Sequence, residues 1–90
     1  MPVYVEMVVR PPDPAKFEAA AKESIGEKPD GLIEQWFGRL ESDPGLYAFG
    51  GVWQSHDAMH AYSEKIGDEF NAKAGTEGVE WETKVWEIMS

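Results

Sequence analysis

The chain has 90 residues, no cysteine and a formal net charge of −9. This length gives one domain, residues 1–90, and the lack of cysteine excludes thiol catalysis, disulfides, Fe–S clusters and cysteine zinc sites. The acidic charge argues against nucleic acid and membrane partners, because such a surface repels phosphate groups and anionic lipids. With no signal-peptide pattern and no apolar run of membrane-spanning length, we expect a cytoplasmic protein.

The first expected element is a strand over residues 3–10, because apolar and mixed positions alternate with a period of two. The wholly apolar face, which should pack on a core, consists of Val3, Val5, Met7 and Val9. The other face is mixed and consists of Tyr4, Glu6, Val8 and Arg10. Asp13 and Pro14 then begin a helix that ends near Ile25, since Asp is a good N-cap and Pro suits the first helical position. Gly26 is its expected stop.

The second strand is expected over Leu32–Leu40, after a turn at Lys28–Gly31. Alternation divides this strand into two sets, and the sequence leaves open which set faces the helices: Leu32, Glu34, Trp36 and Leu40, or Ile33, Gln35, Phe37 and Arg39. Ser42–Gly45 should connect it to the next strand as a hairpin, because Pro44 suits the first central position of a turn.

The third strand is expected over Leu46–Trp53, with an aliphatic face and an aromatic face. The aliphatic face has side chains small enough for close helix packing and consists of Leu46, Ala48, Gly50 and Val52. The aromatic face consists of Tyr47, Phe49, Gly51 and Trp53. Two adjacent glycines weaken a strand, so we interpret Gly50–Gly51 as a bulge, with close approach to a ligand as the alternative.

Ser55 caps the second expected helix, which Gly67 could divide into two pieces. A loop at Gly75–Gly78 then precedes a fourth strand over Val79–Ile88. The resulting order, β-α-β-β-α-β, predicts the α+β ferredoxin-like fold, in which both helices cover one face of a four-stranded antiparallel sheet.

The open face of this sheet is the expected partner surface. In this assignment it carries five aromatic or apolar residues: Tyr4, Val8, Tyr47, Phe49 and Trp53. This is too much apolar surface to leave in water, so we expect a homodimer in which two sheets pack face to face.

Several motifs resemble the dimeric α+β barrel superfamily. Residues 51–59, GVWQSHDAM, are similar to the strand-Trp-x-Ser-x-x-Ala-hydrophobic pattern that begins the second helix in many members. A finer resemblance to the YdhR-type mono-oxygenases rests on Pro29-Asp30-Gly31-Leu32 to Trp36, Gly50-Gly51, Ala61-Tyr62, Gly78-Val79 and Lys84-Val85-Trp86. The resemblance covers Phe17 to Ile88 and implies the barrel fold, with antibiotic-biosynthesis mono-oxygenases among its relatives.

The resemblance also implies a ligand pocket between the helices and the sheet of each subunit. The leading hypothesis is a mono-oxygenase that acts on a small aromatic or polyketide-like substrate without metal or flavin. Deprotonation of a phenol or an anthrone-type carbon acid would give an anion that reacts directly with oxygen. An apolar slot for such a substrate would be formed by four residues: Phe17, Trp36, Met59 and Trp81.

His56 and His60 are the only histidines and lie four residues apart, on one side of a helix. In the functional interpretation His60 is the general base, because an imidazole titrates near neutrality. In the alternative, both histidines are half-exposed surface residues. Tyr62, with His56 or Gln35, would donate hydrogen bonds to the developing oxyanion. No third ligand accompanies the histidines, so no metal site is predicted.

No cofactor is predicted. The chain has no GxGxxG, GxxxxGK[ST] or GxSxG motif, which argues against nucleotides, flavin and a serine nucleophile. The haem-degrading branch of the superfamily has an asparagine where this chain has Tyr4-Val5-Glu6, so haem is not expected. Two other functions remain open: a polyketide cyclase or isomerase that uses the same pocket, and a non-catalytic ligand-binding or stress-response barrel.

Overall fold

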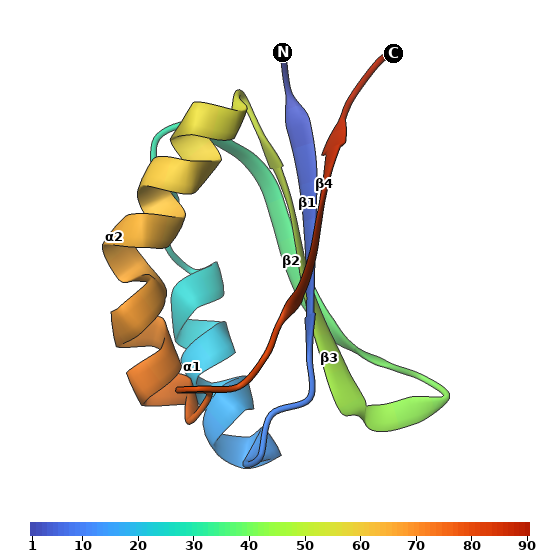
Figure 1. The fold of residues 1–90 in the computed structure, drawn as a ribbon, viewed down its shortest axis with the longest axis vertical. Coiled ribbons are helices and arrows are strands. Elements are labelled where there is room, and N and C mark those ends of the chain that lie inside the picture. The colour runs from blue at the N-terminus through green and yellow to red at the C-terminus, as the bar shows by residue number, and fades with distance from the viewer.

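The computed structural model describes residues 1–90 and has the expected order of elements. These are the strands and helices β1 (Val3–Val9), α1 (Pro14–Ile25), β2 (Leu32–Leu40), β3 (Asp43–Trp53), α2 (His56–Ala74) and β4 (Glu82–Glu87). Both helices cover one face of the sheet and leave the other face open (Figure 1). The prediction of a ferredoxin-like fold is therefore confirmed.

The sheet has the strand order β2-β3-β1-β4, and every neighbouring pair is antiparallel. Val3 lies opposite Trp53 and Val9 lies opposite Tyr47. Directly opposed residues share one face of a sheet, so the apolar side of β1 and the aromatic side of β3 both face the helices.

The predicted open face is therefore partly wrong. Tyr47, Phe49 and Trp53 are only 3%, 6% and 6% exposed, because the register of β3 against β1 places them under the helices. Alternation separates two sets of side chains, but only the register decides which set is buried. Tyr4 and Val8 do lie on the open face, as predicted.

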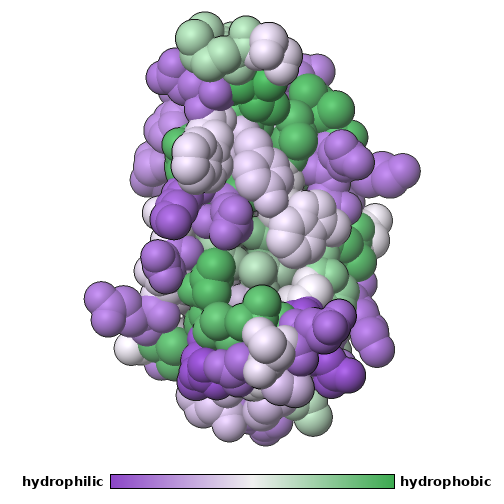
Figure 2. Space-filling view, turned by 90° about the vertical axis from the view of Figure 1, so that its right-hand side faces the viewer, coloured by the Kyte–Doolittle hydropathy of each residue, from purple (hydrophilic) through white to green (hydrophobic).

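The register places a different set of large side chains on the open face. It consists of Tyr4 and Val8 from β1, Trp36 from β2, Val52 from β3 and Trp86 from β4. Figure 2 looks onto this face and shows a band of pale ring-bearing side chains crossing it between green aliphatic ones. This set is called the open-face patch below.

Gly50 and Gly51 form no bulge, since both pair regularly with β1 and with β2. A Cβ on Gly50 would lie 2.2 Å from Cε2 of Trp36, so this glycine makes room for the indole on the open face. The irregularity lies instead in β2, where the register shifts between Leu32 and Glu34. This shift places Leu32 against the core and sends Gln35 to the same face.

The ends of the elements follow the sequence signals, with three differences. Asp13 and Ser55 each accept a hydrogen bond from the backbone three residues on, and Gly75 ends α2 in the left-handed conformation. Gly67 does not divide α2, which runs unbroken for 19 residues. β3 begins at Asp43, within the predicted turn, and β4 begins three residues later than expected. Neither helix is long and apolar enough to cross a membrane.

The core consists of two clusters. The larger surrounds Phe17, which is completely buried and has ring centroids at 5.1–6.1 Å from Tyr47, Phe49, Phe70 and Trp81. The smaller comprises Val3, Val5, Trp53 and Met59. Both clusters contribute to the wall of one cavity, which therefore lies where they meet.

Candidate active site

A cavity of about 240 Å³ lies between the helices and the covered face of the sheet. Its walls are mainly aromatic rings and thioethers: Met7, Phe49, Trp53, Met59, Phe70 and Trp81. Ligand pockets for drug-sized molecules hold roughly 300–1,000 Å³, so this cavity suits a ligand of one or two fused rings.

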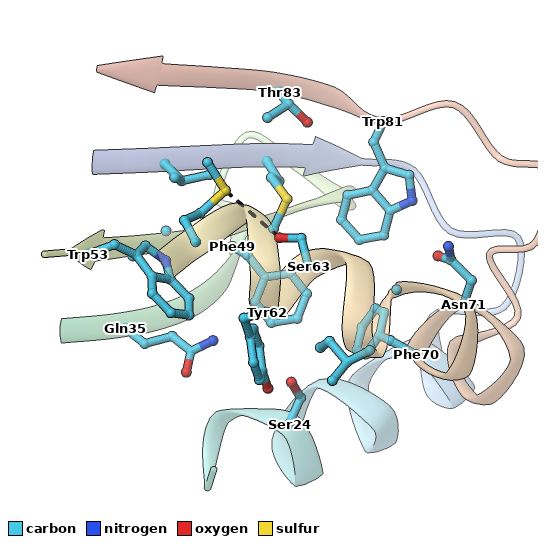
Figure 3. Close-up of a pocket in the computed structure, with 17 residues that line it drawn as sticks. Ser24, Gln35, Phe49, Trp53, Tyr62, Ser63, Phe70, Asn71, Trp81 and Thr83 are labelled. Atoms are coloured by element: carbon cyan, nitrogen blue, oxygen red, sulfur yellow. Dashed lines mark hydrogen bonds between the residues drawn. The ribbon is translucent and has the colours of Figure 1, made fainter. Parts of the chain in front are cut away.

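None of the 17 lining residues carries a charged side chain. The polar side chains among them are Ser24, Gln35, Tyr62, Ser63, Asn71 and Thr83. Asn71 and Trp81 lie toward one end of the cavity, while Gln35 lies toward the other and the Tyr62 hydroxyl points to Ser24 of α1 (Figure 3). Such a site favours a neutral planar ligand that forms a few hydrogen bonds at its edges.

The structure brings four of the predicted site residues to this cavity: Gln35, Met59, Tyr62 and Trp81. Phe17 and Trp36 are not among the lining residues. Phe17 lies in the core, in contact with the wall residues Phe49 and Trp81, and Trp36 lies on the opposite face of the sheet over Gly50. The predicted slot is therefore corrected: Phe49, Trp53 and Phe70 line it in place of Phe17 and Trp36.

Neither histidine reaches the cavity. The His60 side chain is 61% exposed, and its Nε2 lies 3.3 Å from Oε1 of Glu64 on the outer side of α2. His56 stacks on His60, with ring centroids 6.0 Å apart. Met59 and Ser63 turn toward the cavity, whereas His60 is rotated by about 100° from Met59 around the helix. The geometry gives the histidine base no support and agrees with the surface interpretation.

Tyr62 connects the cavity to the outside. Its ring packs on Trp53 with centroids 5.5 Å apart, and its hydroxyl donates a hydrogen bond to Oε2 of Glu27 at 3.1 Å. Partial burial, and then the Glu27 carboxylate, raise the pKa of Tyr62 above its usual range. The phenol therefore keeps its proton at neutral pH.

Asn71 is a site residue that the sequence analysis missed. Its Oδ1 accepts a hydrogen bond of 2.7 Å from the hydroxyl of Thr76, which is 1% exposed. The backbone N–H of Thr76 also donates to the Asn71 carbonyl at 3.0 Å. Since Oδ1 is occupied, the amide nitrogen of Asn71 remains free to donate to a ligand. The spacing of Met59, Ser63, Gly67 and Asn71, four residues each, is the signal that could have found it.

The structure contains no group of three His, Asp or Glu side chains that could hold a metal ion. The lining offers no carboxylate or imidazole either, so its donor set does not suit a resident cation.

Known structures share this architecture over almost the whole chain. SnoaB, a cofactor-independent oxygenase from Streptomyces nogalater, matches with a TM-score of 0.76 and 16% identity over 99% of this chain and 93% of its own. Rv0793 from Mycobacterium tuberculosis matches with a TM-score of 0.82 and 16% identity over 100% and 97%. A candidate antibiotic biosynthesis monooxygenase from Bordetella bronchiseptica matches with a TM-score of 0.77 and 14% identity over 99% and 98%.

The chain shares with these structures the fold of a four-stranded antiparallel sheet covered on one face by two helices. No protein-family model and no curated protein sequence matches it. At identities below 20%, the likeness to these structures establishes the fold, while substrate and chemistry have to be argued from the cavity.

Proposed function

We propose that this barrel protein is a cofactor-independent mono-oxygenase for a small, neutral aromatic substrate. The observation that carries the proposal is the uncharged, aromatic-walled cavity, in the same fold as an oxygenase that works without a cofactor. A cavity of about 240 Å³ favours a one- or two-ring phenol or hydroquinone over a larger polyketide.

In this proposal the substrate supplies the electrons for oxygen reduction. Loss of the phenolic proton to solvent leaves an anion whose negative charge extends to a ring carbon that still carries a hydrogen. This carbon forms a bond to dioxygen, the resulting peroxide anion takes up a proton to give a hydroperoxide, and loss of water from the hydroperoxide gives a quinone. One oxygen atom enters the product and the other leaves as water, so no external reductant is needed.

The cavity would favour this step in two ways. Its rings and thioethers hold a planar substrate and reduce its contact with water, which strengthens the hydrogen bonds inside. The Asn71 amide and the Trp81 indole N–H lie toward one end, where they could donate to the oxygen that gains negative charge on deprotonation. Neither donor depends on a histidine, so we assign no role to His56 or His60.

Oxygen uptake by EDTA-treated protein tests the proposal. The substrates would be hydroquinone and 1,4-naphthohydroquinone, measured against the spontaneous rate. Gly67 lines the cavity and a Cβ there would meet no atom within 4 Å, so Gly67→Leu should fill the cavity and Gly67→Ala should not. We expect uptake that Gly67→Leu abolishes and that Gly67→Ala and the His56→Ala/His60→Ala double variant retain. Absence of uptake by the natural protein, or uptake that survives Gly67→Leu, would refute the proposal.

A second function has support from the same observation. A cavity without a charged side chain also suits a barrel that binds a neutral aromatic ligand without converting it. This alternative predicts saturable binding that Gly67→Leu abolishes, with no oxygen consumed and no product formed. A cyclase or isomerase would instead form product at the same rate without oxygen.

We also propose that two copies of the chain pair through the open-face patch. Trp36 and Trp86 in this patch are 43% and 55% exposed, and all six residues of β4 are exposed. A twofold pairing would cover these rings against the same patch of the second copy. Sedimentation velocity of Val8→Glu should show a monomer, while Ala61→Glu, on the exposed side of α2, should leave a dimer. A monomeric natural protein would contradict the pairing.

A further inference from the structure

Tyr62 lines the cavity, and its hydroxyl donates a hydrogen bond to a residue outside it. Glu27 follows α1, is exposed and is not a lining residue, yet its Oε2 accepts the Tyr62 hydroxyl proton at 3.1 Å. A tyrosine hydroxyl has one proton to donate and lone pairs with which to accept. An ionised carboxylate can only accept, so this contact fixes the direction in which the Tyr62 proton points.

The cavity side of the Tyr62 oxygen is consequently an acceptor. Its proton is held by Glu27, and a bound ligand meets only the lone pairs of the oxygen. A ligand hydroxyl can donate to this oxygen. A ligand carbonyl at the same position would face lone pairs without a proton between them, which is unfavourable because neither oxygen gains a hydrogen bond for the water it gives up.

We propose that Glu27, acting through Tyr62, makes the cavity select ligands with a hydroxyl group and reject the corresponding carbonyl compounds. Glu27 is thus a positioning residue that sets specificity from outside the cavity. The inference rests on the proposed function in that the ligand is a small aromatic molecule held in this cavity. It would let the site bind a reduced hydroquinone or phenol and release an oxidised, carbonyl-bearing product.

Ser24 does not remove this selectivity. Its hydroxyl lines the cavity beside the Tyr62 oxygen and can donate to one of its lone pairs. A second lone pair then remains for the ligand, and the Tyr62 proton is still held by Glu27.

Two ligands of the same skeleton test the proposal: 1,4-naphthohydroquinone and 1,4-naphthoquinone. Isothermal titration calorimetry under anaerobic conditions gives both dissociation constants without turnover. The natural protein should bind the hydroquinone about tenfold more tightly than the quinone. Glu27→Ala frees the Tyr62 proton to turn inward, so quinone binding should become severalfold tighter and the ratio should approach one. If Glu27 only supports the fold, Glu27→Ala should weaken the binding of both ligands to the same extent.

Matched variants complete the experiment. Glu23→Ala removes an acid from the last turn of α1, four residues before Glu27, whose Oε1 lies 3.1 Å from Nζ of Lys73, and it should leave the ratio unchanged. Tyr62→Phe should weaken the binding of the hydroquinone and leave the binding of the quinone unchanged. Equal binding of the two compounds, failure of both to bind, or an unchanged ratio in Glu27→Ala would overturn the inference. Selective binding without oxygen uptake would overturn the proposed oxygenase and leave this inference standing.

Discussion

The hydrogen bond from Thr76 to Asn71 gives the most direct test of how the cavity is built. Thr76→Val keeps nearly the same shape but removes the hydroxyl that donates to Asn71 Oδ1 at 2.7 Å. An acceptor left without its donor in a buried site costs roughly 1–3 kcal/mol. Asn71 is only partly buried, so we expect the lower end of this range. About 1 kcal/mol lowers the Tm of a domain of this size by roughly 4–8 °C.

The same substitution should also affect turnover. Removing one donor to a developing oxyanion typically lowers kcat by roughly 10²–10³-fold. Thr76→Val leaves the Asn71 amide in place but unrestrained, so we expect a smaller loss, about tenfold, in the oxygen-uptake assay. Since the affected bond forms mainly in the transition state, kcat should fall more than KM rises.

Thermal melting and oxygen uptake, measured on the same preparations, test whether this hydrogen bond stabilises the fold and orients Asn71. Thr76→Ser is the control, because it retains the hydroxyl and loses only a methyl group. It should keep the activity of the natural protein, while Thr76→Val loses both stability and kcat. If Thr76→Val has the natural Tm and the natural kcat, the hydrogen bond neither stabilises the fold nor orients Asn71, and the assignment of Asn71 as an oxyanion donor fails.

Three further outcomes follow from the geometry. Phe17→Ala should lower the free energy of unfolding in urea by about 3–5 kcal/mol and Phe17→Leu by much less, because Phe17 is completely buried; a loss below 1 kcal/mol in Phe17→Ala would contradict its central place in the core. Gly67→Ala should stabilise α2 by roughly 0.5–1 kcal/mol, since its Cβ meets no atom within 4 Å, and a lowered Tm would refute this. The hydrogen bond to Glu18 raises the pKa of Tyr47, and burial raises that of Tyr62, so the folded state holds these protons more tightly than the unfolded state. The contribution of these two tyrosines to stability should be constant up to about pH 10 and fall as the pH rises further. The natural protein should therefore lose stability more steeply than Tyr47→Phe/Tyr62→Phe, and equal losses above that pH would contradict this.

The element order was predictable because its signals are local. Asp13, Ser55 and Gly75 mark helix ends through contacts within a few residues, and alternation marks the strands. The burial of Tyr47, Phe49 and Trp53 was not predictable in this way. It depends on which residues of β1 lie opposite β3, which is a contact between segments more than 30 positions apart.

The candidate site likewise contains residues that local sequence patterns place correctly and residues that they do not. Met59, Tyr62 and Trp81 reach the cavity because a helix face and a strand edge carry them there. His60 follows Met59 directly, yet one residue turns a helix by about 100°, which is enough to move the imidazole to the surface. The Glu27–Tyr62 contact spans 35 positions between the end of α1 and the middle of α2, and no local pattern indicates it.

The edge strand β4 links the proposed assembly to the cavity. It pairs only with β1, and all six of its residues are exposed, so little within one chain holds it in place. Thr83 in β4, and Trp81 just before it, nevertheless form part of the cavity wall. A second copy on the open-face patch would cover Trp86 and hold β4 against β1. This contact would keep Trp81 and Thr83 in place in the cavity wall. A ligand in contact with Trp81 should then bind the dimer more tightly than the monomer, and by reciprocity the ligand should strengthen the dimer by the same factor.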